Sequence, residues 1–69
     1  MDTIAIGKRL VEERNRRGET QQQVAEATGL SIAAIGMYER GERIPRDKHK
    51  IALADHFNCS VESLFFVFE

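Results

Sequence analysis

Residues 20–41 read TQQQVAEATGLSIAAIGMYERG, and this stretch decides the fold. Thr20, with Gln23 three residues later, forms a capping-box pattern that predicts a helix over Gln21–Thr28. Gly29 follows, and glycine is the residue best able to adopt the left-handed conformation that ends a helix. The segment therefore predicts a short helix followed by a sharp turn.

A second short helix is predicted from Ile32 to about Arg40, with Ser31 as its N-cap. Ile35 and Tyr38 lie three residues apart and so share one face, which we expect to be buried. Two short helices joined by a three-residue turn, here at about residues 21–40, are typical of the helix-turn-helix motif. In that motif the first helix braces the second, which enters the DNA major groove.

Helical patterns continue on both sides of this segment, and strand patterns are absent apart from an ambiguous apolar tail. Helices are predicted over Ile4–Arg17, capped by Asp2 or Thr3, and over Lys48–Phe57, capped by Asp47. Asn58 is expected to close the latter, and Ser60 to cap a short last helix. The expected fold class is all-α, with five helices in one domain spanning residues 1–69. The positions expected to face inward are Ile6, Leu10, Val11, Val24, Ala25, Ala27, Ile51, Leu53, Ala54, Phe57, Val61, Leu64 and Phe65.

The composition excludes several classes of protein. A chain of 69 residues lies near the lower size limit for folding alone, and its single cysteine, Cys59, removes the disulfide option. His49 and His56 belong to no metal-ligand pattern, and no catalytic set or phosphate-cradling loop is present. We therefore expect no enzyme, metal, cofactor or small-molecule ligand. Because no apolar run resembles a signal peptide or a membrane span, a cytoplasmic location is expected.

The charges are unevenly distributed, although the net charge is only −1. All ten basic residues fall in two windows, Lys8–Arg17 and Arg40–Lys50, each with five bases against two acids. If the two windows meet on one face, they form a positive surface suited to nucleic acid. The alternative is that they are ordinary solvated helix surfaces.

The stretch Arg14–Pro45, RNRRGETQQQVAEATGLSIAAIGMYERGERIP, resembles the lambda-repressor-like (Xre-type, Cro-like) helix-turn-helix family. The matching features are a basic helix end, a capped glutamine, a small alanine, the turn glycine, a buried isoleucine and Tyr-Glu-x-Gly before a proline. The alanine-rich fourth helix and the Ser-Val-x-x-Leu-Phe ending at Ser60–Phe65 also resemble the family's last two helices. The resemblance implies a five-helix DNA-binding domain of a small bacterial or phage transcriptional regulator.

The resemblance also implies roles for individual residues. The second helix of the motif, from Ile32 to about Arg40, is called the reading helix here. Gln21, with Thr20 before it, matches a position that contacts the DNA backbone and packs against this reading helix. Arg14 and Glu39 match an arginine and a glutamate that form a buried ion pair in relatives. Phosphate contacts are implied for Arg40, Arg43 and Arg46, which lie at and after the end of the reading helix.

Base contacts are expected at outward positions of the third helix, and there this chain departs from the family's usual polar residues. Only Ser31 offers a hydrogen bond. The others are apolar or lack a side chain, so contacts with thymine methyl groups and DNA shape are expected to outweigh direct hydrogen bonding to bases. The expected set is Ser31, Ile32, Ala33, Gly36 and Met37.

The tail at residues 66–69 has two interpretations. Phe66, Val67 and Phe68 either fold back onto the first helix or form a homodimer interface, which is the prediction adopted here. A homodimer would bind a pseudo-palindromic operator and act by operator occlusion, since so short a chain leaves little room for a sensing domain. The alternative function is a protein-interaction module, in which the apolar face of the third helix and the tail hold another regulator or a toxin-like partner.

Overall fold

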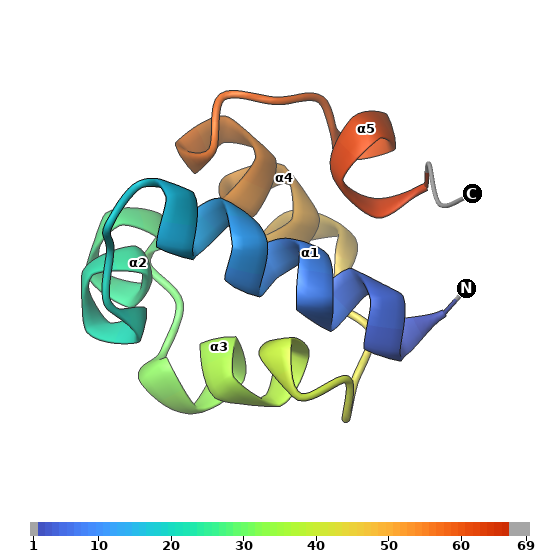
Figure 1. Cartoon of the computed structure of the whole chain (residues 1–69), viewed down its shortest axis with the longest axis horizontal. Helices are drawn as coiled ribbons and strands as arrows, with labels where there is room; N and C mark the ends of the chain where they lie inside the picture. The colour runs from blue at the N-terminus through green and yellow to red at the C-terminus, as the bar shows by residue number, and fades with distance from the viewer. Residues whose placement is uncertain (1, 67–69) are drawn as a thin grey trace.

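Five helices account for most of residues 2–66, the part of the chain that the computed structural model describes (Figure 1). They are α1 (Thr3–Arg16), α2 (Gln21–Thr28), α3 (Ile32–Glu39), α4 (Asp47–His56) and α5 (Val61–Phe65). Within these residues there is no strand. The predicted all-α class with five helices is confirmed.

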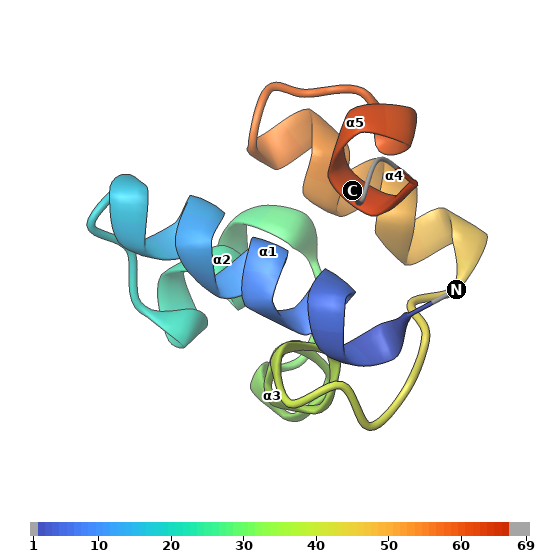
Figure 2. The same ribbon diagram turned by 45° about the vertical axis from the view of Figure 1, so that its right-hand side comes forward.

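Helix α1 runs through the middle of the molecule, and the other helices are arranged around it (Figures 1 and 2). Helix α3 lies on one side of α1, and α4 and α5 lie on the opposite side in both views. Contacts link α1 to α3 and α5, and α2 to α3 and α4. Because every helix contributes apolar side chains, a single core forms from Ile6, Leu10, Val24, Ala25, Ile35, Tyr38, Leu53, Ala54, Phe57, Leu64 and Phe65.

Most helix ends lie within one residue of the prediction, but the start of α4 differs for a clear reason. Asp47 was predicted to cap this helix, and that prediction is wrong. Arg46, extended at φ −64° and ψ 157°, takes the cap position without a side-chain hydrogen bond. Asp47 is the first helical residue, where a negative charge interacts favourably with the positive end of the helix. Its carboxylate also lies 3.8 Å from the Lys50 ammonium.

The buried stripe of α4 excludes Ile51, which was wrongly predicted to face inward. The stripe consists of Lys50, Leu53, Ala54 and Phe57, spaced at i, i+3, i+4 and i+7 as a helical face requires. Ile51 lies outside that spacing and is 55% exposed. Lys50 occupies the buried position because its long aliphatic stem can cover apolar surface. Ala27, also predicted to face inward, is exposed, whereas Val11 and Val61 are half-buried.

Gly7 lets α1 and the end of α3 approach each other backbone to backbone. A Cβ atom at this position would lie 2.8 Å from the Tyr38 carbonyl oxygen and closer still to that of Glu39. Neither carbonyl can move without displacing the end of α3. By contrast, a Cβ at Gly36 would meet only the guanidinium end of Arg40, at 2.9 Å.

We predict that Gly7→Ala lowers the free energy of unfolding by about 2 kcal/mol, because the added methyl group collides with main-chain atoms. Gly36→Ala is the matched control. It adds the same methyl group within a helix but meets a flexible side chain, so its stability should stay equal or rise by up to about 1 kcal/mol. Urea unfolding followed by circular dichroism measures both. Equal stability of the two variants would contradict this account of the contact between α1 and α3.

Candidate nucleic-acid interface

Local hydrogen bonds fix the geometry of the turn between α2 and α3. The Thr20 side chain accepts from the Gln23 amide, and the Gln23 side chain accepts from the Thr20 amide, so the predicted capping box is confirmed. Gly29 has φ +76°, and its N–H donates to the Ala25 carbonyl. The Ser31 hydroxyl oxygen accepts from the Ala34 amide at 3.0 Å and begins α3. Both helices of the motif are therefore capped by their own sequence.

One face of α3 is anchored in the core, and the opposite face is open. Ile35 and Tyr38 are buried, as predicted from their spacing. Ser31, Ile32 and Ala33 are exposed at the start of the helix. An exposed face on a helix that is braced from behind is the geometry that major-groove binding requires.

The other two predicted base-contact residues are less accessible than the first three. Met37 is half-buried. Gly36 is buried, and the Arg40 guanidinium lies beside it. A side chain that interacts four residues back along the helix could not be inferred from the sequence, since it depends on the rotamer of Arg40.

The predicted phosphate-contact arginines differ in their surroundings. Arg40 forms an exposed ion pair with Glu42, with Nε 2.7 Å from the carboxylate. This hydrogen bond raises the pKa of Arg40 and lowers the pKa of Glu42. Arg43 and Arg46 are exposed, and within residues 2–66 neither forms an ion pair. Arg43 and Arg46 are thus the cations most readily available to an external anion at this end of α3.

Glu39 joins three helices through its carboxylate. Arg14 on α1 donates to both of its oxygens, at 2.7 Å and 3.1 Å. Gln21 on α2 donates to one of them at 2.9 Å. Arg14 also donates to the Glu19 carbonyl at 2.9 Å. The Glu39 side chain is only 7% exposed, so these donors replace the water that the carboxylate loses on burial.

The hydrogen bonds of this network have two consequences. They raise the pKa of Arg14, because the Glu39 carboxylate stabilises the charged guanidinium. They also engage the side-chain amide of Gln21, which was predicted to contact the DNA backbone. Thr20, predicted to make the same kind of contact, is exposed. Gln21 therefore has a bracing role within the protein.

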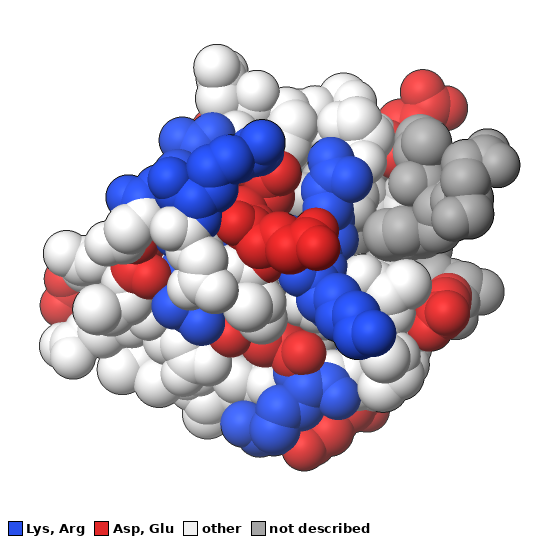
Figure 3. Space-filling view, viewed as in Figure 1, with Lys and Arg blue, Asp and Glu red and all other residues white. Residues whose placement is uncertain are grey.

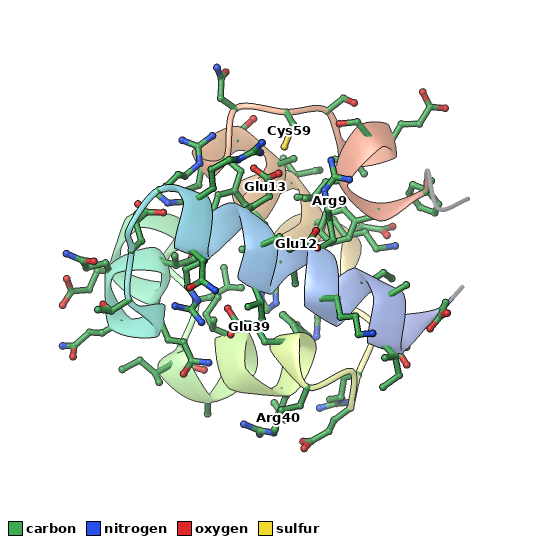
Figure 4. The ribbon with its side chains drawn as sticks, in the orientation of Figure 1. Arg9, Glu12, Glu13, Glu39, Arg40 and Cys59 are labelled. Carbon is green, nitrogen blue, oxygen red and sulfur yellow. The ribbon has the colours of Figure 1, made fainter. Side chains whose placement is uncertain are left out.

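The two basic windows do not form one uninterrupted positive surface on the side of the molecule shown in Figure 3. Figure 4 places Arg9 between α1 and α5, and Arg40 on the far side of α3. Arg9 and Arg16 both pair with Glu13, a buried carboxylate whose partners follow helical spacing at i−4 and i+3. In Figure 3 acidic side chains lie between separate groups of basic ones. The second window follows α3 directly, whereas Arg14 of the first window reaches α3 only through its bonds to Glu39.

Polar contacts of Arg17 and Glu19 also hold α4 in place, and the sequence did not indicate them. Arg17 donates to the Phe57 carbonyl, and its guanidinium lies 5.5 Å from the Phe57 ring centre. The His56 Nε2 atom lies 2.9 Å from the Glu19 carboxylate. These pairs join segments about 40 residues apart, and so no local pattern reveals them.

Other kinds of site find little support in the described part of the chain. Residues 2–66 contain no group of three side chains able to hold a metal ion. The half-buried Cys59 is a free thiol. No helix described here has the length and apolar character needed to cross a membrane.

We predict that Arg14→Met lowers the free energy of unfolding by about 3 kcal/mol, because it leaves the Glu39 carboxylate buried without its main partner. The double variant Arg14→Met with Glu39→Leu should lose less than the sum of the two single variants, with a coupling energy of roughly 1–3 kcal/mol. Denaturant unfolding of all four proteins gives this coupling. If the losses in the free energy of unfolding of the two single variants add up to that of the double variant, the Arg14–Glu39 interaction itself contributes nothing to stability.

Comparison with known proteins places this geometry in a family. The family described as "Helix-turn-helix" matches residues 10–64. YazB of Bacillus subtilis, an uncharacterized HTH-type transcriptional regulator, is 36% identical over 64 residues, which cover 93% of each chain. RstR, a transcriptional repressor of the cryptic phage CTXphi of Vibrio cholerae, is 32% identical over 61 residues. That match covers 88% of this chain and 54% of RstR, so the chain spans about half the length of that relative.

A solved structure agrees with this assignment. The restriction-modification controller protein C.AhdI from Aeromonas hydrophila superposes with a TM-score of 0.87 and 31% identity. The match covers 93% of this chain and 97% of C.AhdI. The chain therefore belongs to the lambda-repressor-like helix-turn-helix family of DNA-binding transcriptional regulators.

Proposed function

We propose that this chain represses transcription by binding double-stranded DNA in the cytoplasm, with α3 in the major groove. The observation that carries the proposal is the exposed face of α3, held against α1 and α2 by the Glu39 network and ending beside Arg43 and Arg46. RstR is a repressor, and its similarity supports repression over activation.

Base recognition in this proposal rests on a small and largely apolar surface. Ser31 retains its hydroxyl proton for a base, because its oxygen is used only as the acceptor of the helix cap. Ile32, Ala33 and Met37 contact thymine methyl groups, and Gly36 contributes only backbone beneath the Arg40 side chain. Specificity then comes partly from groove shape and DNA deformability.

Phosphate contacts supply most of the affinity in this proposal. Arg43 and Arg46 bind phosphates directly, since neither has an internal carboxylate partner in the described residues. To bind a phosphate, Arg40 must give up its ion pair with Glu42. Gln21 must share its side-chain amide between a phosphate and the Glu39 carboxylate. Thr20, exposed at the start of α2, is the remaining phosphate contact.

A homodimer is proposed through the apolar surface of α4 and the end of α5. Ile51 and Phe66 are 55% and 53% exposed, and both line a groove of about 360 Å³ that also includes Val61. The Lys50 ammonium lies 5.0 Å from the Phe66 ring centre, which holds the ring against α4 while leaving half of it open. Val67 and Phe68, assigned to the same interface from the sequence, lie outside the described residues.

A two-fold dimer of this kind binds a pseudo-palindromic operator whose half-sites are about one helical turn apart. Linking two reading helices raises affinity without new contacts in either half-site. Repression then follows from occlusion, because a dimer bound across a promoter excludes polymerase from the same DNA.

A second candidate function is protein binding on the same fold. Ile32 is 46% exposed on the reading face, and Ile44 in the following loop is 47% exposed. Apolar side chains at such positions are also found at protein interfaces. In that case the partner is another regulator or a toxin-like protein.

We predict that Arg43→Ala and Arg46→Ala each weaken binding to a mixed-sequence duplex and lower the slope of log affinity against log salt by roughly 1. Lys8→Ala is the matched control, because it removes one exposed positive charge from α1 that, like Arg43 and Arg46, forms no ion pair within residues 2–66. Fluorescence anisotropy over a salt series measures both quantities. Affinity and slope that are unchanged in the double variant Arg43→Ala with Arg46→Ala would favour the protein-binding function.

We predict that Ile51→Ser together with Phe66→Ser converts a dimer into a monomer, because the groove loses the two apolar side chains that a second copy would cover. Ile44→Ser is the control, since it removes a similarly exposed apolar side chain outside this groove. Sedimentation equilibrium gives the mass of each protein. A dimer that survives the double substitution would place the interface elsewhere.

A further inference from the structure

A hollow of about 170 Å³ lies between the end of α3, the loop after it and the first turn of α4. Two arginines enter it from the loop and a histidine from α4, and no acidic side chain lines it. Neither arginine forms an ion pair with any residue between 2 and 66, so the charge of the hollow is not neutralised from within. The lining side chains used in the argument are Met37, Tyr38, Arg43, Arg46 and His49.

The histidine of this hollow is held by a buried tyrosine. The Tyr38 hydroxyl lies 2.7 Å from His49 Nδ1, and the two rings meet edge to face. When the hydroxyl donates to Nδ1, the neutral imidazole carries its proton on Nε2. Nε2 is then a hydrogen-bond donor whose ring orientation is fixed by the tyrosine, as donors in prearranged anion sites are.

The start of α4 adds to the positive character of this hollow. His49 is the third residue of a ten-residue helix, and the N-cap residue Arg46 makes no side-chain hydrogen bond to the first turn. The unsatisfied N–H groups of a first turn favour a negative charge nearby, and the one acidic residue of this turn, Asp47, does not line the hollow. Two arginines, a histidine bonded to a tyrosine and the first turn of α4 thus border one small hollow.

We infer that this hollow binds a phosphate group, with Arg43 and Arg46 supplying charge and His49 Nε2 donating a hydrogen bond. Tyr38 is a positioning residue that acts through His49. Met37, from the reading face of α3, forms part of the same wall, so a bound phosphate lies at the edge of the base-reading surface. If the phosphate belongs to the DNA backbone, the inference rests on the proposed function. The same chemistry also suits the phosphate of a free phosphorylated molecule.

The first arm of the test uses inorganic phosphate and no DNA. Proton–nitrogen NMR spectra of the protein are recorded during a phosphate titration, with sodium chloride at matched ionic strength as reference. We expect saturable shifts in the amides of residues 46–50 and in the His49 imidazole. His49→Asn keeps an acceptor for Tyr38 but lacks the Nε2 donor, and should weaken phosphate binding roughly tenfold. His56→Asn is the matched control and should bind phosphate as the unmodified protein does.

The role of Tyr38 has its own readout. In the unmodified protein the His49 ring nitrogens should show the tautomer protonated at Nε2, and Tyr38→Phe should give a mixture of tautomers with weaker phosphate binding. A purely structural role of the hydroxyl would change stability and leave the phosphate affinity of the folded protein unaffected. Arg43→Gln together with Arg46→Gln, both exposed positions, tests the site without disturbing the core, and should abolish the saturable shifts.

The second arm measures the affinity of His49→Asn for a duplex. A loss in both arms identifies the backbone phosphate as the ligand, whereas a loss for inorganic phosphate alone identifies a free phosphorylated molecule. Phosphate binding by a protein that fails to bind any duplex would refute the proposed function and leave this site standing. Shifts that do not saturate, that are reproduced by chloride, or that persist in the double arginine variant would overturn the inference.

Discussion

The arrangement of the reading helix depends on one buried carboxylate. Glu39 stands at the end of α3 and receives donors from α1 and α2, and the close passage of α1 at Gly7 lies at the same end. A buried carboxylate without these donors would cost several kcal/mol, so alternative packings of α3 are strongly disfavoured. The three helices therefore present the outward face of α3 in a fixed orientation.

A rigid but polar-poor reading face has consequences for recognition. Ser31 is the only hydrogen-bonding side chain among the five residues proposed to contact bases, so the proposed discrimination between bases relies on methyl contacts and on DNA shape. In the proposed function, affinity depends on the arginines after α3 and on a second copy of the chain. The basic residues of the chain, whose net charge is −1, therefore differ in role: Arg43 and Arg46 of the second window are proposed to bind DNA, whereas Arg14 and Arg17 of the first window bond Glu39 and the Phe57 carbonyl within the protein.

Sequence reasoning succeeded where local chemistry decides structure. The capping box at Thr20, the caps at Ser31 and Ser60, and the left-handed Asn58 at φ 56° follow from residue type and spacing. It failed where tertiary context decides, as in the exposure of Ile51 in favour of the Lys50 stem. The covering of Gly36 by Arg40 and the pairing of Tyr38 with His49 depend on rotamers and on segments that meet only in the folded chain.

In the proposed function, α3 reads DNA as part of a symmetric dimer. The most direct test is selection of random duplexes by the purified protein, followed by sequencing of the retained DNA. The account predicts enrichment of a two-fold-symmetric motif with half-sites about one helical turn apart. Weak, salt-sensitive retention without any enriched motif would contradict it, and would leave the exposed apolar face of α3 to a protein partner.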